Sequence, residues 1–158
     1  MINLIFALDR NNLFGNDNKL AWHYSEDLQY FKQKTLSKKC IMGEQTFYSV
    51  LRNGKPLPNR ISVVATLTDF EFPGVEVTHD IFKYLEEHKD EDLYIIGGKS
   101  IIELTYKKAD VIYLTYIDAD HEGNVYLNLD LSNFDLVEET ISGILHFRKY
   151  IRKQGLKI

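Results

Sequence analysis

The sequence predicts an α/β fold built on a mainly parallel sheet. Short apolar runs typical of buried strands alternate with helical patterns, which is the arrangement of parallel α/β proteins. The end of the chain differs, because Phe134–Thr140 and Ile144–Arg152 flank a Ser142-Gly143 turn and predict an antiparallel hairpin at one sheet edge. Folds of this kind bind ligands beyond the carboxyl ends of their strands.

The remaining strands are predicted from short apolar or β-branched runs. They are Ile2–Leu8, Cys40–Met42, Ile61–Ala65, Leu93–Ile96 and Ile112–Ile117. Two helices follow from apolar residues three and four positions apart, the first capped by Ser25 and the second by Asp80 or Thr78. The first helix carries Leu28, Phe31 and Thr35 on one face, and the second carries Ile81, Tyr84 and Leu85. The stretch 53–59, with two prolines and a glycine, is predicted as a loop.

Length and composition indicate one domain, residues 1–158, that is able to bury a core without disulfides or metals. An apolar fraction of 44% excludes disorder, and a net charge of −4 gives no basic excess for nucleic acid. The histidines and the single cysteine, Cys40, show no zinc-site spacing, so we expect no metal.

Cysteine usage and the start of the chain favour a cytoplasmic protein. Cys40 cannot form an internal disulfide, and the apolar opening Ile2–Leu8 lacks the positive flank and cleavage site of a signal peptide. No apolar run approaches the roughly 20 residues that span a bilayer, so we expect no membrane partner.

Two strand-to-helix turns could hold phosphate groups. The strand ending at Ile96 runs into Gly97-Gly98-Lys99-Ser100, and glycine with a free helix start favours an anion. By itself this segment fits equally well with a turn that needs glycine for steric reasons. The turn Gly43-Glu44-Gln45-Thr46 repeats the arrangement, so two helix starts could hold the two ends of a dinucleotide, although no complete G-x-G-x-x-G is present.

Asp27 is the second candidate site, in the first turn of the first predicted helix. It lies four residues before Phe31, so the carboxylate and the ring can face one cleft. The residues alone favour a simpler role, in which Asp27 offsets the helix dipole by about 0.3–1 kcal/mol and Trp22 belongs to the core. Arg60 could bind a carboxylate in a bidentate manner, but a loop arginine is more often solvated.

A succession of motifs resembles the dihydrofolate reductases in order and spacing, over nearly the whole chain. The motifs are Ala21-Trp22, Asp27-Leu28, Phe31-Lys32, Ile41-Met42-Gly43, Thr46-Phe47, Pro56-Leu57-Pro58-Asn59-Arg60, Ile96-Gly97-Gly98, Tyr113-Leu114-Thr115 and Glu122-Gly123. The resemblance implies an eight-stranded, mostly parallel sheet with about four flanking helices and an antiparallel C-terminal hairpin.

The implied activity is that of an oxidoreductase. It reduces 7,8-dihydrofolate to 5,6,7,8-tetrahydrofolate by hydride transfer from NADPH, and so supplies one-carbon metabolism and thymidylate synthesis. Antifolate inhibitors are expected to bind, and we expect a monomer.

The resemblance also assigns site residues. Asp27 would accept hydrogen bonds from the pteridine, and Thr115 would support the Asp27 carboxylate. Trp22 would hold an ordered water, and Leu20 is the third residue assigned to catalysis. Arg60 would bind the carboxylate of the glutamate tail. The other substrate contacts would be Ile5, Ala7, Leu28, Phe31, Val50, Leu57 and Ile96.

The implied cofactor site lies along the strand ends, and a polar lid, residues 9–24, would close over the nicotinamide. A cis peptide is expected between Gly97 and Gly98. The cofactor contacts would be Ala7, Asn18, Gly43, Glu44, Gln45, Thr46, Thr66, Leu67, His79, Gly97, Gly98, Lys99, Ser100 and Ile101.

The chain departs from the family pattern at several places. Ala21 and Ser25 replace prolines at the lid, about three residues are added between Val50 and Leu57, and Asn124 replaces a lid-stabilising aspartate. Glu44 stands at the expected contact of the 2′-phosphate, where a basic group is common, so NADH is also possible.

Two alternatives remain open at this stage. A pyrimidine reductase of riboflavin synthesis resembles this fold and uses the same cofactor, but Trp22 with Asp27 at this spacing argues against it. A non-catalytic dinucleotide-binding module is favoured only by Glu44 and the altered lid. A dihydrofolate-dependent loss of nicotinamide absorbance would separate the three.

Overall fold

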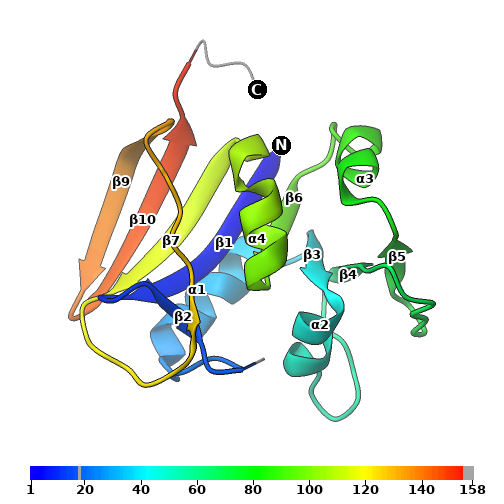
Figure 1. Cartoon of the computed structure of the whole chain (residues 1–158), viewed down its shortest axis with the longest axis horizontal. Coiled ribbons are helices and arrows are strands. Elements are labelled where there is room, and N and C mark those ends of the chain that lie inside the picture. The colour runs from blue at the N-terminus through cyan, green and yellow to red at the C-terminus, as the bar shows by residue number, and fades with distance from the viewer. Residues whose placement is uncertain (18, 155–158) are drawn as a thin grey trace.

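An eight-stranded sheet forms the centre of the molecule, with the strand order β5-β4-β3-β6-β1-β7-β10-β9 (Figure 1). The computed structural model describes residues 1–17 and 19–154. All neighbouring pairs from β5 to β7 are parallel, whereas β10 runs antiparallel to both β7 and β9. The strands are β1 (Ile2–Asp9), β3 (Lys39–Gly43), β4 (Ile61–Ala65), β5 (Glu76–Thr78), β6 (Leu93–Gly97), β7 (Val111–Ile117), β9 (Phe134–Ser142) and β10 (Leu145–Arg152). The predicted fold class is confirmed.

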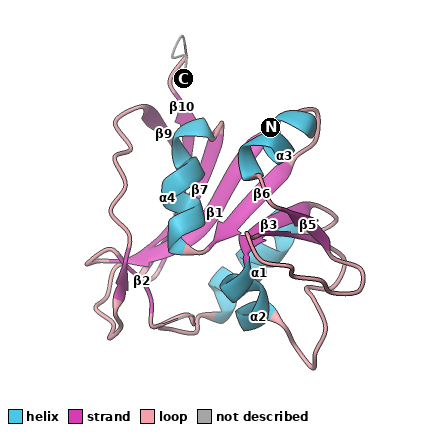
Figure 2. Ribbon diagram, turned by 45° about the vertical axis from the view of Figure 1, so that its right-hand side comes forward, coloured by secondary structure: helices cyan, strands magenta, loops and turns pink. Residues whose placement is uncertain are grey.

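Helices cover both faces of this sheet, with α4 on one face and α1 on the other (Figure 2). The helices are α1 (Ser25–Thr35), α2 (Glu44–Val50), α3 (Ile81–Glu87) and α4 (Lys99–Thr105), followed by a short 3-10 turn, η1 (Tyr106–Lys108). A second, two-stranded sheet pairs β2 (Leu13–Gly15) with β8 (Val125–Tyr126). No helix in the described residues is both long and apolar enough to cross a membrane.

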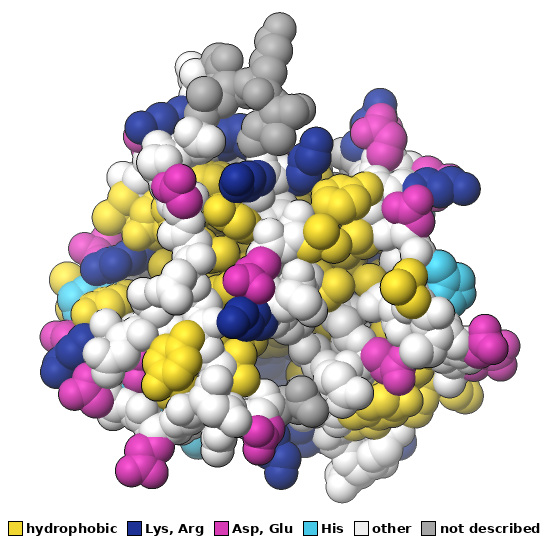
Figure 3. Space-filling model, in the orientation of Figure 1, with side chains coloured by type: hydrophobic (Ala, Val, Ile, Leu, Met, Phe, Trp, Pro, Cys, Tyr) yellow, Lys and Arg dark blue, Asp and Glu magenta, His cyan; other side chains and the backbone are white. Residues whose placement is uncertain are grey.

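The central strand β1 explains why the strands appear in the sequence as continuous apolar runs. Leu4, Phe6 and Leu8 pack in one cluster with Ile102 of α4, whereas Ile5 packs in the cluster that α1 and α2 cover. Both faces of a parallel sheet are buried, so apolar residues occupy successive positions rather than alternate ones. Figure 3 shows acidic and basic side chains interspersed on the outer surface of the α4 face.

The helix starts only partly match their predictions. Asp80 caps α3, because its Oδ1 accepts a hydrogen bond from the Lys83 amide at 3.1 Å. The prediction that Ser25 caps α1 is wrong, because Tyr24 is the N-cap residue and makes no side-chain cap bond. The helix begins one residue too early for Ser25 to adopt the extended backbone that a cap requires.

Three short strands were missed, namely β2, β5 and β8, which have only two or three residues each. The predicted loop 53–59 is confirmed, and its added residues close a tight turn in which Arg52 and Lys55 exchange two backbone hydrogen bonds of 3.0 Å. The expected cis peptide between Gly97 and Gly98 is present.

Cys40 should be inert in the folded protein. Its side chain lies in β3 with 0% exposure, and burial raises the pKa of its thiol to about 12, against the smaller lowering effects of Arg60 and Thr35. Because the thiolate is the reactive form, a disulfide reagent at pH 8 should label the native chain only as it unfolds, and the urea-unfolded chain at once. Labelling of the native chain as fast as that of the unfolded chain would contradict this packing.

Candidate active site

Asp27 is held at the junction of α1 and the sheet. Its Oδ1 accepts a hydrogen bond of 2.7 Å from the Thr115 hydroxyl on β7, and Thr115 is in turn paired with Ala7 on β1. Burial raises the pKa of the Asp27 carboxyl, and the hydrogen bond from Thr115 opposes that rise without cancelling it. The sequence-predicted pair Asp27 and Thr115 is thus brought together, with a carboxylate that is costly to ionise.

Most of the apolar residues predicted to contact substrate belong to one cluster, which includes Phe31, four residues after Asp27 on α1. Ile5 and Ile96 are buried, and the others pack against the same cluster from α1, α2 and the loop after α2. The latter are Phe31, Val50 and Leu57. Leu28 and Leu20 lie outside this cluster, with side chains 38% and 56% exposed.

Arg60 is oriented at the rim of that cluster. Its Nε donates to the Pro58 carbonyl at 2.9 Å, and its Nη1 donates to the Thr35 hydroxyl at 3.3 Å. The guanidinium lies 6.0 Å from the centre of the Phe31 ring. Among the described residues it forms no ion pair with a carboxylate, so its remaining N–H donors are available to an anion.

The carboxyl ends of β3, β4 and β5 lie side by side. Gly43 is in register with Ala65, and Ala65 with Thr78, so the residues that follow them meet at one edge. These following residues are three predicted cofactor contacts, Glu44, Thr66 and His79.

Hydrogen bonds lock these edge residues together. Glu44 Oε1 accepts from the Thr66 hydroxyl at 3.0 Å and from the Thr68 hydroxyl at 2.6 Å. His79 Nδ1 lies 2.7 Å from the Thr66 carbonyl oxygen. Leu67 projects from this edge and is almost fully exposed. The Glu44 carboxylate is therefore held on the protein rather than free in solvent.

The starts of α2 and α4 approach each other through Thr46, beside Gly98, and Ile101, beside Gly43. A Cβ added to Gly98 would lie 3.1 Å from the Thr46 hydroxyl, and one added to Gly43 would lie 3.4 Å from Ile101 Cγ1. Gly97 has a φ of 146°, which only glycine adopts readily. Glycine at positions 43 and 98 therefore lets the two helix starts approach each other closely. Gln45, Lys99 and Ser100 are exposed at these starts, and Asn18, another predicted contact, lies outside the described residues.

Asn124 ties the polar segment before α1 to the loop after β7. Its Oδ1 accepts from the Asp17 amide at 2.7 Å, and its Nδ2 donates to the Asp17 carboxylate at 2.8 Å. Its own amide donates to the Gly15 carbonyl at 3.2 Å. Asparagine at this position thus supports the segment with three hydrogen bonds.

The sequence did not reveal a buried polar network around Trp22. Its indole lies against the ring of His121, which contacts the fully buried Asp9 and the hydroxyl of Tyr24. Asp9 and His121 are 112 positions apart, so no local pattern could have paired them. Among the described residues, no group of three or more histidine, cysteine or acidic side chains is placed to hold a metal.

Comparisons with known proteins agree with this geometry. The dihydrofolate reductase family model matches residues 1–144. Dihydrofolate reductase of Bacillus subtilis is 40% identical over 140 residues, which cover 87% of this chain and 82% of that protein, and dihydrofolate reductase type 3 of Salmonella typhimurium is 41% identical over 128 residues, which cover 80% and 77%. The structure of dihydrofolate reductase from Enterococcus faecalis complexed with NADP(H) and RAB-propyl superposes with a TM-score of 0.88 at 28% identity, covering 98% and 97% of the two chains. The chain therefore belongs to the dihydrofolate reductase family.

Proposed function

We propose that the chain reduces 7,8-dihydrofolate to 5,6,7,8-tetrahydrofolate with NADPH, and so supplies one-carbon metabolism and thymidylate synthesis. Family membership supports the reaction, and the NADP(H) complex of the similar structure supports the cofactor. Similarity over 98% of the chain supports one reductase domain over residues 1–158. The observation that carries the proposal is the partly buried Asp27 carboxylate, held by Thr115 beside the apolar cluster of Ile5 and Phe31.

In this proposal Asp27 recognises the pterin. Its Oδ1 is engaged by Thr115, and a carboxylate oxygen can accept further hydrogen bonds, so the carboxylate can accept the N3 and 2-amino hydrogens of the ring. A negative charge in this partly buried position favours the protonated pterin. When bound, NADPH supplies the hydride, which goes to pterin C6 while N5 gains a proton through water.

The remaining contacts follow the shape of the substrate. The apolar side chains of Phe31, Val50 and Leu57 would pack on the aromatic body, and the oriented Arg60 would bind the tail carboxylate. The proposal also gives Leu28 a contact at the rim, and Leu20 and Trp22 a place in the lid. Antifolates would occupy the same cluster.

In this proposal the dinucleotide lies along the starts of α2 and α4, two strand-to-helix turns that approach each other at Gly43 and Gly98. Backbone N–H groups at helix starts favour phosphate. The proposed contacts are the predicted set, Ala7, Asn18, Gly43, Glu44, Gln45, Thr46, Thr66, Leu67, His79, Gly97, Gly98, Lys99, Ser100 and Ile101.

We also propose that the protein is a cytoplasmic monomer. The single cysteine, Cys40, is buried and fits a reducing compartment. The edge strand β9 exposes Asp135, Glu138 and Glu139, and charges on an edge oppose strand pairing between copies. Light scattering should give the mass of one chain.

Replacing Asp27 tests whether its carboxylate recognises the substrate or only stabilises the fold. Because the pKa of Asp27 is raised in the folded state, ionising this side chain costs more in the folded than in the unfolded chain. The free energy of unfolding therefore declines as the pH rises through the unfolded and then the folded pKa of Asp27. Asp27→Asn keeps an oxygen for Thr115 and removes that charge. We expect the variant to melt at or above wild type at pH 7, yet to lose about a hundredfold or more in turnover, recovering partly in acid, where the substrate is protonated in solution.

Glu26 provides the matched control, since it is a carboxylate in the same helical turn that bonds the Ser142 hydroxyl at 2.8 Å. Glu26→Gln should leave turnover within about twofold of wild type. If Asp27→Asn instead loses about 1 kcal/mol of stability and keeps its turnover, Asp27 serves the helix dipole only.

Glu44 should weaken the preference for NADPH over NADH, because its carboxylate is fixed by Thr66 and Thr68 where the resemblance puts the 2′-phosphate. Unit charges about 4 Å apart near a surface repel by about 4 kcal/mol before screening. We expect Glu44→Arg to raise kcat/KM for NADPH much more than for NADH, and the control Glu71→Arg, at an exposed position between β4 and β5, to raise neither. A wild-type preference near a thousandfold that Glu44→Arg leaves unchanged would contradict the assignment.

A further inference from the structure

His121 joins three parts of the chain that are distant in sequence. It lies in the segment 118–124 after β7, and its side chain is only 12% exposed. Its Nδ1 lies 3.2 Å from Asp9 Oδ2, and its Nε2 lies 2.7 Å from the Tyr24 hydroxyl. The centre of its ring lies 4.9 Å from that of Trp22. One imidazole thus contacts the end of β1 and both aromatic residues that lead into α1.

Asp9 is the fixed end of this network. It has 0% exposure and accepts hydrogen bonds from the amides of Asn11, Leu13 and His121, besides the imidazole. Burial raises the pKa of the Asp9 carboxyl, but these hydrogen bonds outweigh it and lower the pKa below its ordinary value. Asp9 is therefore a carboxylate at neutral pH, and the imidazole must carry its hydrogen on Nδ1.

The hydrogen on Nδ1 decides how Tyr24 is held. In the neutral imidazole Nε2 is an acceptor, so the Tyr24 hydroxyl donates to His121 and His121 donates to Asp9. When His121 is protonated, Nε2 becomes a donor and the Tyr24 oxygen accepts. Both contacts survive, but a positive charge then stands beside the Trp22 indole.

The other end of the network leads to Asp27. Tyr24 is the N-cap residue of α1, and its carbonyl accepts from the Leu28 amide at 3.1 Å, across the turn that contains Asp27. Trp22 packs on the same small cluster as Ala7, and its Nε1 is buried with no protein partner in the described part of the chain. A buried donor without a protein partner is available to a ligand or water.

We infer that His121 is a positioning residue for the reduction: by holding Tyr24 and Trp22 against Asp9, it sets the place of the indole and of the first turn of α1, and with it the Asp27 carboxylate. The inference rests on the proposed reduction of dihydrofolate. His121 acts through Tyr24 and Trp22 and does not touch the reacting atoms.

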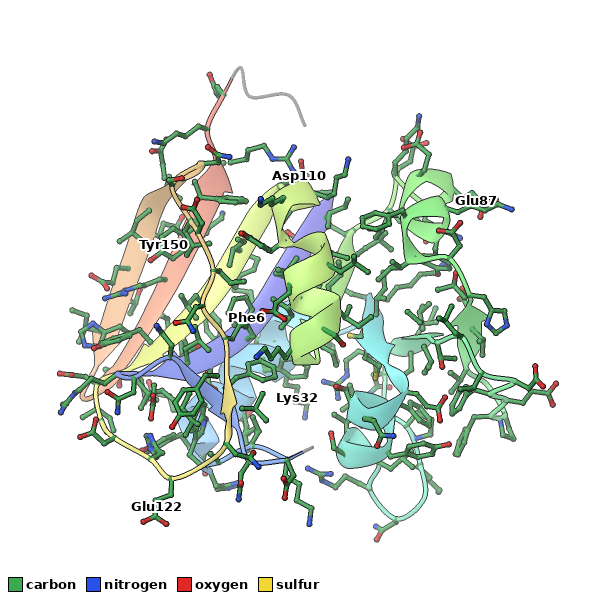
Figure 4. All side chains as sticks on the ribbon, viewed as in Figure 1. Phe6, Lys32, Glu87, Asp110, Glu122 and Tyr150 are labelled. Atoms are coloured by element: carbon green, nitrogen blue, oxygen red, sulfur yellow. The ribbon has the colours of Figure 1, made fainter. Side chains whose placement is uncertain are left out.

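Among the described residues, two titratable side chains contact the His121 imidazole, Asp9 at the end of β1 and Tyr24 just before α1. In its own segment, Asp118 and Asp120 pair with Arg10 at 3.0 and 3.7 Å. Figure 4 shows Glu122 at the outer turn, pointing outward from the molecule.

Trp22 is the only tryptophan, so its fluorescence reports on this contact directly. Loss of a ring packed on an indole changes the intensity and wavelength of its emission. We expect His121→Gln to change the emission of the folded protein at pH 7, because the ring centred 4.9 Å from that of Trp22 is removed. The exposed neighbour His23 is the matched control, and His23→Gln should keep the wild-type emission. An emission that His121→Gln leaves unchanged overturns the inference.

Kinetics test the positioning role. Tyr24→Phe removes one hydrogen bond while keeping the ring, and we expect kcat to fall about fivefold with KM for NADPH within about twofold. His121→Gln should lower kcat at least as much, and the double variant no further than the lower single, because both act through one contact. Unchanged kcat in both single variants, with only a lower melting temperature, means that the network is structural alone. A wild-type protein without reductase activity refutes the proposed function, while the comparison of emission spectra still tests the contact between His121 and Trp22.

Discussion

The hydrogen bond from Thr115 to Asp27 is the constraint on which the site depends. The first turn of α1 has few other contacts with the rest of the fold, since Leu28 is exposed and no side chain caps the start of the helix. Glu26 accepts one hydrogen bond from Ser142, and Tyr24, just before the helix, bonds His121. Further along, Tyr30 stacks on Phe147 with ring centres 4.5 Å apart. The 2.7 Å bond to β7 therefore sets where the carboxylate lies relative to the sheet. Because the carboxylate is partly buried, its charged form is unfavourable without a hydrogen-bond donor.

The parallel sheet explains why the two halves of the site can meet. Strands β3, β4, β5 and β6 all end at one edge, where the starts of α2 and α4 approach each other at Gly43 and Gly98. The central strand β1 lies between β6 and β7, so Ala7 and Thr115 connect the cofactor side with the Asp27 side. In the proposed function, substrate and cofactor would approach each other across this one strand, and hydride transfer requires such an approach.

Strands and caps that are encoded by a few adjacent residues could be predicted from the sequence. Features that depend on residues far apart in the chain could not. The buried strands and the Asp80 cap each follow from a few adjacent residues. Ser25 was a wrong cap because Tyr24, which bonds His121 far along the chain, has the extended backbone at the start of α1. The residues also could not decide whether Asp27 serves the helix dipole or the site, since Thr115 lies 88 positions away. The resemblance to the dihydrofolate reductases is what favoured a role for Asp27 in the site.

Carbon-13 NMR of the aspartate carboxyl groups, with Asp27→Asn used to assign the Asp27 signal, tests the central claim most directly. The account predicts that Asp27 titrates above the value of about 3.9 that is usual for aspartate, because burial outweighs its hydrogen bond. It also predicts that Thr115→Val raises this midpoint further, because the bond that favours the charged form is lost. A midpoint at or below the usual value, or one that Thr115→Val leaves unchanged, would contradict the account.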